Sequence, residues 1–291
     1  MIRTIEGLRT RLAEARAAAR PTAASALSPA EPTVALISTI GALHEGHEDL
    51  IRLARDRADI VVVSVFVNPL RFATTAEFEA YPRTPEADAA LLAGLGVDIV
   101  FAPDPAELLP RGAETTRVTA GDLGLRYEGR SRPRYFDALL TVEAKLMQLV
   151  QPDIAVYGRR DRQRVFLVER MVSDLFFGVE VLSVDTVRGE DGLPVSTRVG
   201  MLEPRDLAAA TRLPRALEAA ASNADRGVDA CIAAAQSSLM GEERIRLDYL
   251  VVVDPRTFLP VDEGHRGPAV ALIAATVAGH RFIDNTEIYI G

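Results

Sequence analysis

The feature that most constrains the fold is a repeated alternation of apolar, β-prone runs with segments whose apolar residues recur at helical spacing. VALIST (34–39) precedes a helix-like segment at 47–58, and DIVVVSVFVNP (59–69) precedes another at 84–96. The series continues with VDIVFAP, DIAVYG and VEVLSVDTVR. Nearly apolar strands that alternate with helices are typical of a parallel sheet covered on both faces. The pattern predicts an α/β protein with a Rossmann-like parallel sheet.

The composition changes near residue 190. Residues 204–239 are almost all helix formers, whereas 245–258 and 268–291 predict short strands around turns. We therefore predict a Rossmann-like domain over residues 1–185 and a smaller C-terminal α+β domain over residues 186–291.

The overall composition limits the classes of partner. With 33 Lys plus Arg against 41 Asp plus Glu, the net charge of −8 gives no reason to expect nucleic acid or an acidic membrane surface. A single cysteine, Cys231, excludes an internal disulfide and fits a reducing compartment. Residues 1–20 predict an amphipathic helix, and no run approaches the roughly 18 to 20 apolar residues of a membrane span. We expect a cytoplasmic protein without nucleic-acid or membrane partners.

The stretch GALHEGH (41–47) contains two of the four histidines of the chain, where a predicted strand passes into a helix. In open parallel sheets, ligands gather at the carboxyl ends of the strands, near backbone N–H groups and a positive helix end. Gly41 and Gly46 permit close backbone approach, and His44 and His47 can reach one anion. Two alternatives stay open: histidines that merely share a helix face, and a metal site, although no nearby cysteine or third histidine completes a ligand set.

These residues resemble those of a known family. STIGALHEGHEDLIRLA is similar to the PTMGALHxGH signature of the pantothenate synthetases, the pantoate and β-alanine ligases of the HxGH nucleotidyltransferase superfamily. VVVSVFVNPLRF resembles their VVSIFVNPxQF, and YPRTPEADAALL their YPRTxxxD. YFDALLTVEAKLMQLVQPDIAVYGRRD is similar to HFxGVxTVVxKLFNIVxPDxAxFGEKD, VDTVRGEDGLPVSTR to xPTVREADGLAMSSR, and RFIDNTEI to RLIDNxxL. The resemblance runs in order from about residue 32 to the end.

The resemblance implies a Rossmann-like fold of the HxGH nucleotidyltransferase type, a C-terminal lid domain, a homodimer and a reaction in two steps. A substrate carboxylate attacks the α-phosphate of Mg-ATP to give an acyl-adenylate and pyrophosphate, and an amine then displaces AMP to leave an amide. ATP and Mg²⁺ are the implied cofactors, and β-alanine is the default amine of the family. This chemistry requires positive groups and N–H donors around the triphosphate more than a protein nucleophile.

The resemblance also implies the site residues. His44 and His47 match a histidine pair that binds the phosphates, Arg160 stands in place of a phosphate-binding lysine, and Ser196 and Arg198 belong to a mobile loop that closes on ATP. These five residues are the expected catalytic set. The positions matched to ATP binding are Gly41, His44, Gly46, His47, Gly158, Arg160, Asp161, Val187, Ser196, Thr197 and Arg198. Asp88 remains from an acidic cluster that the family uses near Mg²⁺.

The acid-binding positions depart from the family. Asn68 is retained, but Arg71 and Arg164 replace two glutamines that hold pantoate. Glutamine offers a donor and an acceptor, whereas arginine offers only donors, a fixed charge and a fork suited to a carboxylate. Two converging arginines would repel each other unless an anion lay between them. We predict an acid with a second negative group, such as a dicarboxylate or a phosphorylated or phosphonylated acid; the alternative is that the arginines point to solvent.

Two further departures, Ser38 and Ile40, replace the Pro and Met of PTMG, which touch the nucleotide pocket in the family, at positions that chiefly shape an apolar turn. The leading hypothesis is an AMP-forming acid–amine ligase of this family that uses an acid other than pantoate. The alternatives are an ordinary pantothenate synthetase, a non-catalytic homologue that binds a nucleotide or a partner, and a nucleotidyltransferase that stops at the adenylated product. The retained His44, His47 and Ser196 argue against a non-catalytic role.

Overall fold

The computed structural model describes residues 1–19, 31–72, 74–112 and 116–291. The chain divides into two compact units. Unit 1 comprises Met1–Leu125, Arg132–Gly158 and Leu167–Val184, and unit 2 comprises Arg126–Ser131, Arg159–Phe166 and Asp185–Gly291. The predicted domain boundary, between residues 185 and 186, stays a prediction. The division into units differs from it in that residues 126–131 and 159–166 belong to unit 2.

Unit 1 contains a five-stranded parallel sheet in the order β3-β2-β1-β4-β5, which confirms the predicted α/β class. Its strands are β1 (Val34–Thr39), β2 (Ile60–Val65), β3 (Ile99–Phe101), β4 (Ile154–Gly158) and β5 (Glu180–Val184). β1 pairs with β2 along its whole length and with β4 near its start. The strand order reverses between β1 and β4, and such a switch point is where open α/β sheets bind ligands, at the carboxyl ends of the strands.

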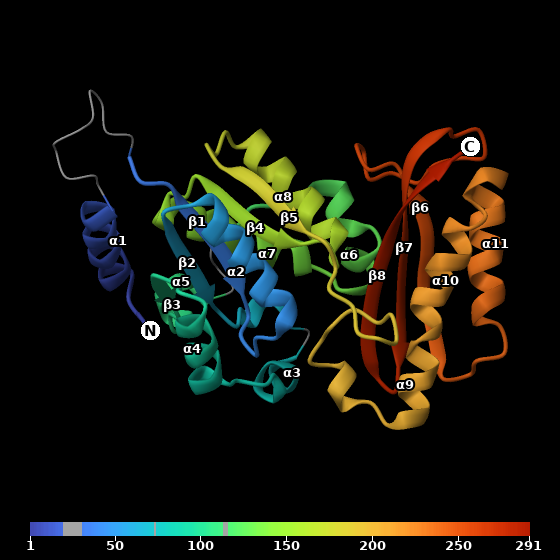
Figure 1. The fold of residues 1–291 in the computed structure, drawn as a ribbon, viewed down its shortest axis with the longest axis horizontal. Helices are drawn as coiled ribbons and strands as arrows, with labels where there is room; N and C mark the ends of the chain where they lie inside the picture. The colour runs from blue at the N-terminus through green and yellow to red at the C-terminus, as the bar shows by residue number, and fades with distance from the viewer. Residues whose placement is uncertain (20–30, 73, 113–115) are drawn as a thin grey trace. The chain divides into compact units, whose positions relative to one another are not determined.

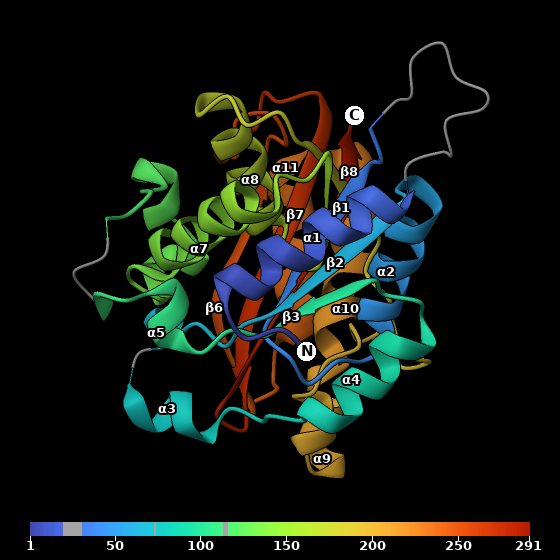
Figure 2. The same ribbon diagram turned by 90° about the vertical axis from the view of Figure 1, so that its left-hand side faces the viewer.

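Helices cover both faces of this sheet. α1 (Ile5–Ala19) and α7 (Tyr135–Val150) lie on one face, with α1 over β2 and β3 (Figure 2). α2 (Glu45–Arg57) and α4 (Pro85–Gly94) cover the other face, where Ala35 and Ile37 of β1 pack against Ile51 and Leu92. Because side chains alternate along a strand, the even-numbered residues of β1 point toward α7. The remaining elements of unit 1 are η1 (Pro69–Arg71), α3 (Thr75–Ala80), α5 (Pro105–Leu108) and η3 (Gly121–Leu125), and α8 (Arg162–Asp174) begins in unit 2 and ends in unit 1.

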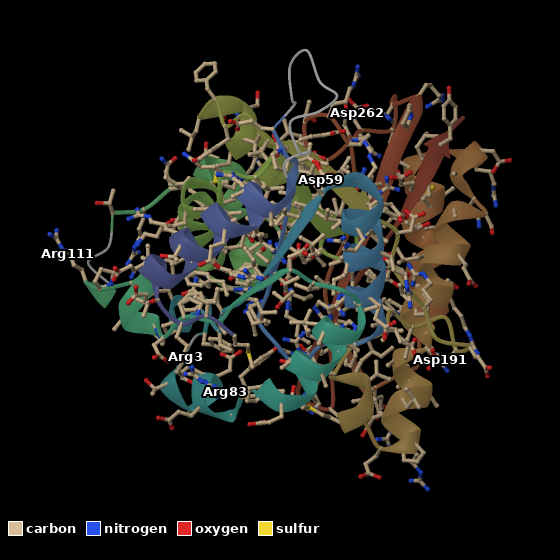
Figure 3. The ribbon with its side chains drawn as sticks, turned by 60° about the vertical axis from the view of Figure 1, so that its left-hand side comes forward. Arg3, Asp59, Arg83, Arg111, Asp191 and Asp262 are labelled. Carbon is tan, nitrogen blue, oxygen red and sulfur yellow. The ribbon has the colours of Figure 1, made fainter. Side chains whose placement is uncertain are left out.

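Two side chains labelled in Figure 3 set the ends of elements in unit 1. Asp59, just before β2, accepts hydrogen bonds from the backbone N–H (2.8 Å) and hydroxyl (2.9 Å) of Thr33, and these bonds lower the pKa of Asp59. Arg83 donates to the carbonyls of Phe78 and Tyr81 at the end of α3, each at 2.9 Å. Arg83 therefore closes α3 immediately before α4 begins.

Unit 2 contains a three-stranded antiparallel sheet, with α10 and α11 along one face (Figure 1). Its elements are α6 (Glu128–Ser131), η4 (Val199–Met201), α9 (Pro204–Ala210), α10 (Arg212–Ala221), η5 (Ala224–Arg226), α11 (Val228–Leu239), β6 (Ile245–Val253), β7 (Gly267–Val277) and β8 (His280–Ile290). The prediction of short strands over 268–291 is wrong, because β7 and β8 have 11 residues each. They are joined by Ala278 and Gly279, which both have positive φ, as a tight two-residue hairpin requires.

Within the described ranges, no helix has both the length and the apolar character needed to cross a membrane.

Candidate active site

The two histidines of GALHEGH cap the first turn of α2. His44 is the N-cap residue, and its Nδ1 accepts a hydrogen bond from the backbone N–H of Gly46 at 3.2 Å. The Nδ1 of His47 accepts from the backbone N–H of His44, also at 3.2 Å. An imidazole nitrogen that accepts a hydrogen bond from a backbone N–H carries no proton of its own. In the neutral form, both rings therefore have their N–H at Nε2. The spacing of three residues thus forms a reciprocal capping box and gives each half-buried ring an Nε2–H donor.

Two glycines of this turn lie close to functional side chains. A Cβ at Gly46 would lie 3.1 Å from Cε1 of His44 and would displace that ring. Gly41 has a φ of +79°, and a Cβ there would lie 3.2 Å from the Oδ2 of Asp88. Gly41 therefore needs glycine because of its positive φ, whereas a side chain at Gly46 would shift the His44 ring by a few tenths of an ångström.

Asp88, in the first turn of α4, is 3% exposed and holds the turn before His44. Its carboxylate accepts from the backbone N–H groups of Ala42 (3.0 Å) and Leu43 (2.9 Å) and from the hydroxyl of Thr84 (3.0 Å). In the part of the chain that the structure describes, no group of three or more His, Cys, Asp or Glu side chains could hold a metal ion. The geometry favours a positioning role for Asp88, and its expected role near Mg²⁺ stays a prediction.

Asn68 and Arg71, the acid-binding positions of unit 1, both contact α7. Asn68 is 2% exposed; its Nδ2 donates to the Ala138 carbonyl at 2.9 Å, and its Oδ1 accepts from the Leu70 N–H at 3.0 Å. The Arg71 guanidinium donates to the Tyr135 hydroxyl at 2.6 Å and lies 4.9 Å from the ring centroid.

A second guanidinium, that of Arg132, lies 3.9 Å from the Tyr135 ring centroid, and its Nη2 donates to the Arg71 carbonyl at 3.1 Å. Among the described residues, no carboxylate forms an ion pair with Arg71 or Arg132. Unit 1 therefore contains two positive groups around one buried tyrosine.

A buried hydrogen-bond network joins β1, α7 and β4. The Ser38 hydroxyl donates to Oε1 of Glu143 at 2.6 Å, and the Tyr157 hydroxyl donates to Oε2 at 2.9 Å. Glu143 and Tyr157 are each 3% exposed. Neither is among the residues predicted from the sequence, although both occupy motif positions where the family pattern has an apolar residue.

In unit 2, the expected ATP-binding residues lie on two segments that touch. Nη1 of Arg160 donates to the Val195 carbonyl at 3.0 Å, and the Val195 N–H donates to the Val187 carbonyl at 2.9 Å. Asp161 accepts from the Arg164 N–H at 3.0 Å and so caps the first turn of α8.

Arg160 lines a pocket of unit 2 together with Ser196 and Arg198. Arg281, Asp284 and several apolar side chains complete its wall. The backbone N–H of Arg198 donates to the Ser196 hydroxyl at 3.3 Å, and Thr197 lies between them in the same loop. Arg160 and Arg198 bring positive charge to this pocket, whereas the Arg281 guanidinium is paired with Glu128 and Asp248.

The dipeptide Asp284–Asn285 of β8 fixes both of these segments. Arg188 makes a bidentate pair with Asp284 at 2.7 and 2.8 Å, and Nδ2 of Asn285 donates to the carbonyls of Arg159 (2.9 Å) and Arg160 (3.0 Å). Burial raises the pKa of Asp284, and the Arg188 partner opposes that rise. Neither residue is predicted from the sequence as part of the site, although the matching RFIDN motif contains both.

The structure thus brings the expected residues together in separate groups. Unit 1 holds the turn with Gly41, His44, Gly46, His47 and Asp88, and also Asn68, Arg71 and Gly158, the last residue of β4. Unit 2 holds Arg160, Asp161, Arg164, Val187, Ser196, Thr197 and Arg198. Because Arg71 and Arg164 belong to different units, their convergence on one acid stays a prediction.

A parallel sheet with its switch point beside a histidine-capped helix is the arrangement expected of HxGH-type nucleotidyltransferases with a Rossmann-like fold. The family model described as Pantoate-beta-alanine ligase matches residues 1–287. The chain is 51% identical over 255 residues to the pantothenate synthetase of Leifsonia xyli subsp. xyli, covering 88% of each, and 46% identical to that of Acidothermus cellulolyticus, covering 87% of this chain and 84% of the relative.

The solved structures most similar to this chain include members of the same family. Pantothenate synthetase from Thermus thermophilus superposes with a TM-score of 0.86 at 40% identity, covering 99% of both chains. The pantoate-beta-alanine ligase of Francisella tularensis, complexed with β-γ ATP and β-alanine, has a TM-score of 0.75 at 26% identity, covering 98% of this chain and 97% of that chain. The chain belongs to the pantoate-beta-alanine ligase family. It is therefore an ATP-dependent ligase that forms an amide bond and releases AMP and pyrophosphate, as the motifs predicted.

Proposed function

We propose that this ligase adenylates a carboxylic acid more anionic than pantoate and then transfers the acyl group to an amine. The observation that supports this specificity is the Arg71–Tyr135–Arg132 cluster, where two guanidiniums flank one ring without a carboxylate partner among the described residues. A bidentate contact between arginine and a carboxylate or phosphate is among the stronger hydrogen-bonded pairs. A second negative group on the acid would neutralise this cluster.

The proposed roles in adenylation follow from the donors of each unit. The Nε2–H groups of His44 and His47 donate to phosphate oxygens and stabilise the charge that develops at the α-phosphate. In the pocket of unit 2, Arg160 and Arg198 supply fixed positive charge and Ser196 a hydroxyl. Gly41, Gly46, Gly158, Asp161, Val187 and Thr197 complete the proposed ATP-binding set.

The proposed cofactors are ATP and Mg²⁺. Mg²⁺ usually keeps several waters and binds through substrate phosphates and one or two carboxylates, which is compatible with a chain whose described residues form no metal cluster. Asp88 is the carboxylate proposed to lie near it, although its oxygens already accept three hydrogen bonds.

The amine is proposed to be β-alanine, because the Francisella tularensis relative was solved with β-alanine and ATP bound. The homodimer and the cytoplasmic location stay predictions.

The acid specificity can be tested by AMP release with ATP, β-alanine and a panel of pantoate, dicarboxylates and phosphorylated hydroxy acids. We expect Arg71→Gln to lower kcat/KM for the dianionic acids by about 10- to 100-fold, the size of a lost charge-assisted contact, and to raise it for pantoate. Arg52→Gln is the matched control, because Arg52 pairs with Glu48 and Asp49 on the exposed face of α2. Rapid turnover of pantoate with no turnover of dianionic acids would refute the proposed specificity.

An ordinary pantothenate synthetase is the second candidate, favoured by the 51% identity to a relative of that name. The same acid panel separates the two candidates. A non-catalytic homologue would be indicated if His44→Ala and His47→Ala left ATP–pyrophosphate exchange unchanged. An enzyme that stops at the adenylate would release AMP at a rate independent of the amine.

A further inference from the structure

Phe176, just after α8, is exposed in a backbone conformation that disfavours it. α8 ends in a Schellman motif, in which the N–H of Phe177 donates to the Val172 carbonyl at 3.0 Å and the N–H of Phe176 donates to the Ser173 carbonyl at 3.3 Å. The residue at this point of the motif is usually glycine because its φ is positive, and Phe176 has a φ of +56°. Its side chain is 92% exposed. Within one copy of the chain, the described residues therefore give little apolar contact in return for a strained backbone and an exposed ring.

An apolar groove lies beside this ring, at the end of α8 and along β5. It is open to solvent and has a volume of about 500 Å³. Its lining residues are Glu169, Val172, Ser173, Phe176, Phe177, Val179 and Val181. Leu175, which precedes Phe176, is also half exposed. These eight residues are named the Phe176 patch, and all of them belong to unit 1.

The patch adjoins an unpaired edge of the parallel sheet. β5 is the last strand of the sheet, and among the described residues no strand pairs with its outer edge, which has one charged residue, Glu180. The opposite edge is covered, because Ile2 donates to the Val100 carbonyl and accepts from the Ala102 N–H, each at 2.8 Å. Proteins usually cover their sheet edges, since unpaired N–H and C=O groups attract other chains. The bare edge beside an exposed aromatic ring indicates a contact with another molecule.

We propose that the Phe176 patch is a contact surface between two copies of this chain, in which the Phe176 ring of each copy enters the groove of the other. A two-fold contact needs both members of each contact on the same surface, because residue i meets residue j and residue j meets residue i. The patch meets this requirement, since it has the protruding ring and the groove side by side. A different partner protein would need only one of the two.

The charges around the patch are compatible with self-association. Two exposed ion pairs flank it: Arg170 with Asp174 at 3.4 Å, and Arg57 with Glu180 at 3.7 Å. Each pair has both signs, so the positive member in one copy can meet the negative member in the other. With Glu169, two positive and three negative groups give this region a formal charge of −1, so most of the net charge of −8 lies elsewhere.

The size of the patch predicts a weak and reversible contact. Its eight residues are fewer than the roughly 20–30 residues a side of a standard interface. The affinity then depends mainly on the aromatic anchor, because a few central aromatic side chains supply most of the binding energy of an interface. Truncating such an anchor weakens association by about 30-fold or more.

The test is sedimentation velocity of the full chain over a range of concentrations. Phe176→Gly removes the ring and suits the positive φ, and Ser173→Arg fills the groove from an exposed position of α8. We expect each variant to weaken self-association by about 30-fold or more. Leu125→Ser is the matched control, because Leu125 is an exposed apolar residue of η3 outside the patch, and its removal should change association by less than about twofold.

An equimolar mixture of Phe176→Gly and Ser173→Arg tests whether the contact is reciprocal. The ring of the Ser173→Arg chain can still enter the groove of the Phe176→Gly chain, so the mixture should associate more tightly than either variant alone. A mixture no tighter than the separate variants would overturn the proposal in favour of a different partner protein. Association of Phe176→Gly equal to that of the wild type would also overturn it. Because the readout is mass and not AMP release, these results are independent of the proposed ligase specificity.

Discussion

Substituting Asp88 tests whether this residue positions the histidine turn or acts on a metal. Asp88→Asn keeps the size of the side chain, but an amide has one accepting end, whereas the carboxylate receives backbone N–H groups from Ala42 on Oδ2 and Leu43 on Oδ1. One of these donors would then face an NH₂ group in a site that is 3% exposed. A hydrogen bond to a charged group contributes about 1.5–3 kcal/mol, so we expect the loss of one such bond in Asp88→Asn to lower the free energy of unfolding by about 1.5–3 kcal/mol.

The assay is urea unfolding without nucleotide or Mg²⁺, combined with the Mg²⁺ dependence of AMP release. A positioning role predicts lower stability in the absence of any ligand, a lower kcat and an unchanged Mg²⁺ dependence. Asp49→Asn is the matched control, because Asp49 is a partly exposed carboxylate of α2 paired with Arg52 and should change stability by less than about 0.5 kcal/mol. Unaltered stability of Asp88→Asn with a shifted Mg²⁺ dependence would refute the positioning role and support the metal role.

Three further predictions follow from the capped turn, the β8 dipeptide and a buried phenol. Gly46→Ala should lower kcat by about tenfold, because its Cβ displaces the His44 ring, and stopped-flow adenylation measures this effect. The free energy of unfolding should change by less than about 1 kcal/mol in urea unfolding, because alanine favours the helix. Asn285→Ala should raise the KM for ATP by about fivefold or more, because Asn285 holds the segment that carries Arg160. In an Arg160→Ala background the same substitution should raise the KM little further. Fully additive effects of the two substitutions on the KM would show that Asn285 does not act through Arg160. Burial raises the pKa of Tyr249 well above 10.0. The free energy of unfolding should therefore fall as the pH rises past 10.0, because the phenol of Tyr249 ionises in the unfolded chain before it ionises in the folded protein. Tyr249→Phe should reduce this loss of stability in unfolding curves measured between pH 9 and 11.

The fold could be predicted well where sequence periodicity is strong. The apolar run of β2 and the helical spacing of α2 led to the parallel sheet, because a strand buried on both faces excludes polar residues. The lengths of β7 and β8 could not be predicted. β7 is buried almost throughout, so its apolar run predicts a strand but does not mark where the strand ends, and pairing with β6 and β8 defines its length.

Some features of the candidate site could also be predicted from local sequence, whereas others depend on tertiary packing. The place and spacing of His44 and His47 follow from local sequence, because a capping box joins residues only three apart. The contacts of Arg71 do not, since they depend on Tyr135, which lies 64 residues later and approaches only when α7 packs on the sheet. Asn285 shows the same limit, as it holds the Arg160 segment from 125 residues away.

By itself, the sequence determined the α/β class, the order of the elements, the family and the histidine turn, because these depend on local periodicity and on motifs read along the chain. Only the tertiary structure decided that Ser38, Glu143 and Tyr157 form one network, and that Asp88 already accepts hydrogen bonds from the turn before His44. The physical reason is that a buried polar group needs partners within hydrogen-bonding distance. Strand order and helix packing determine which distant residues come that close.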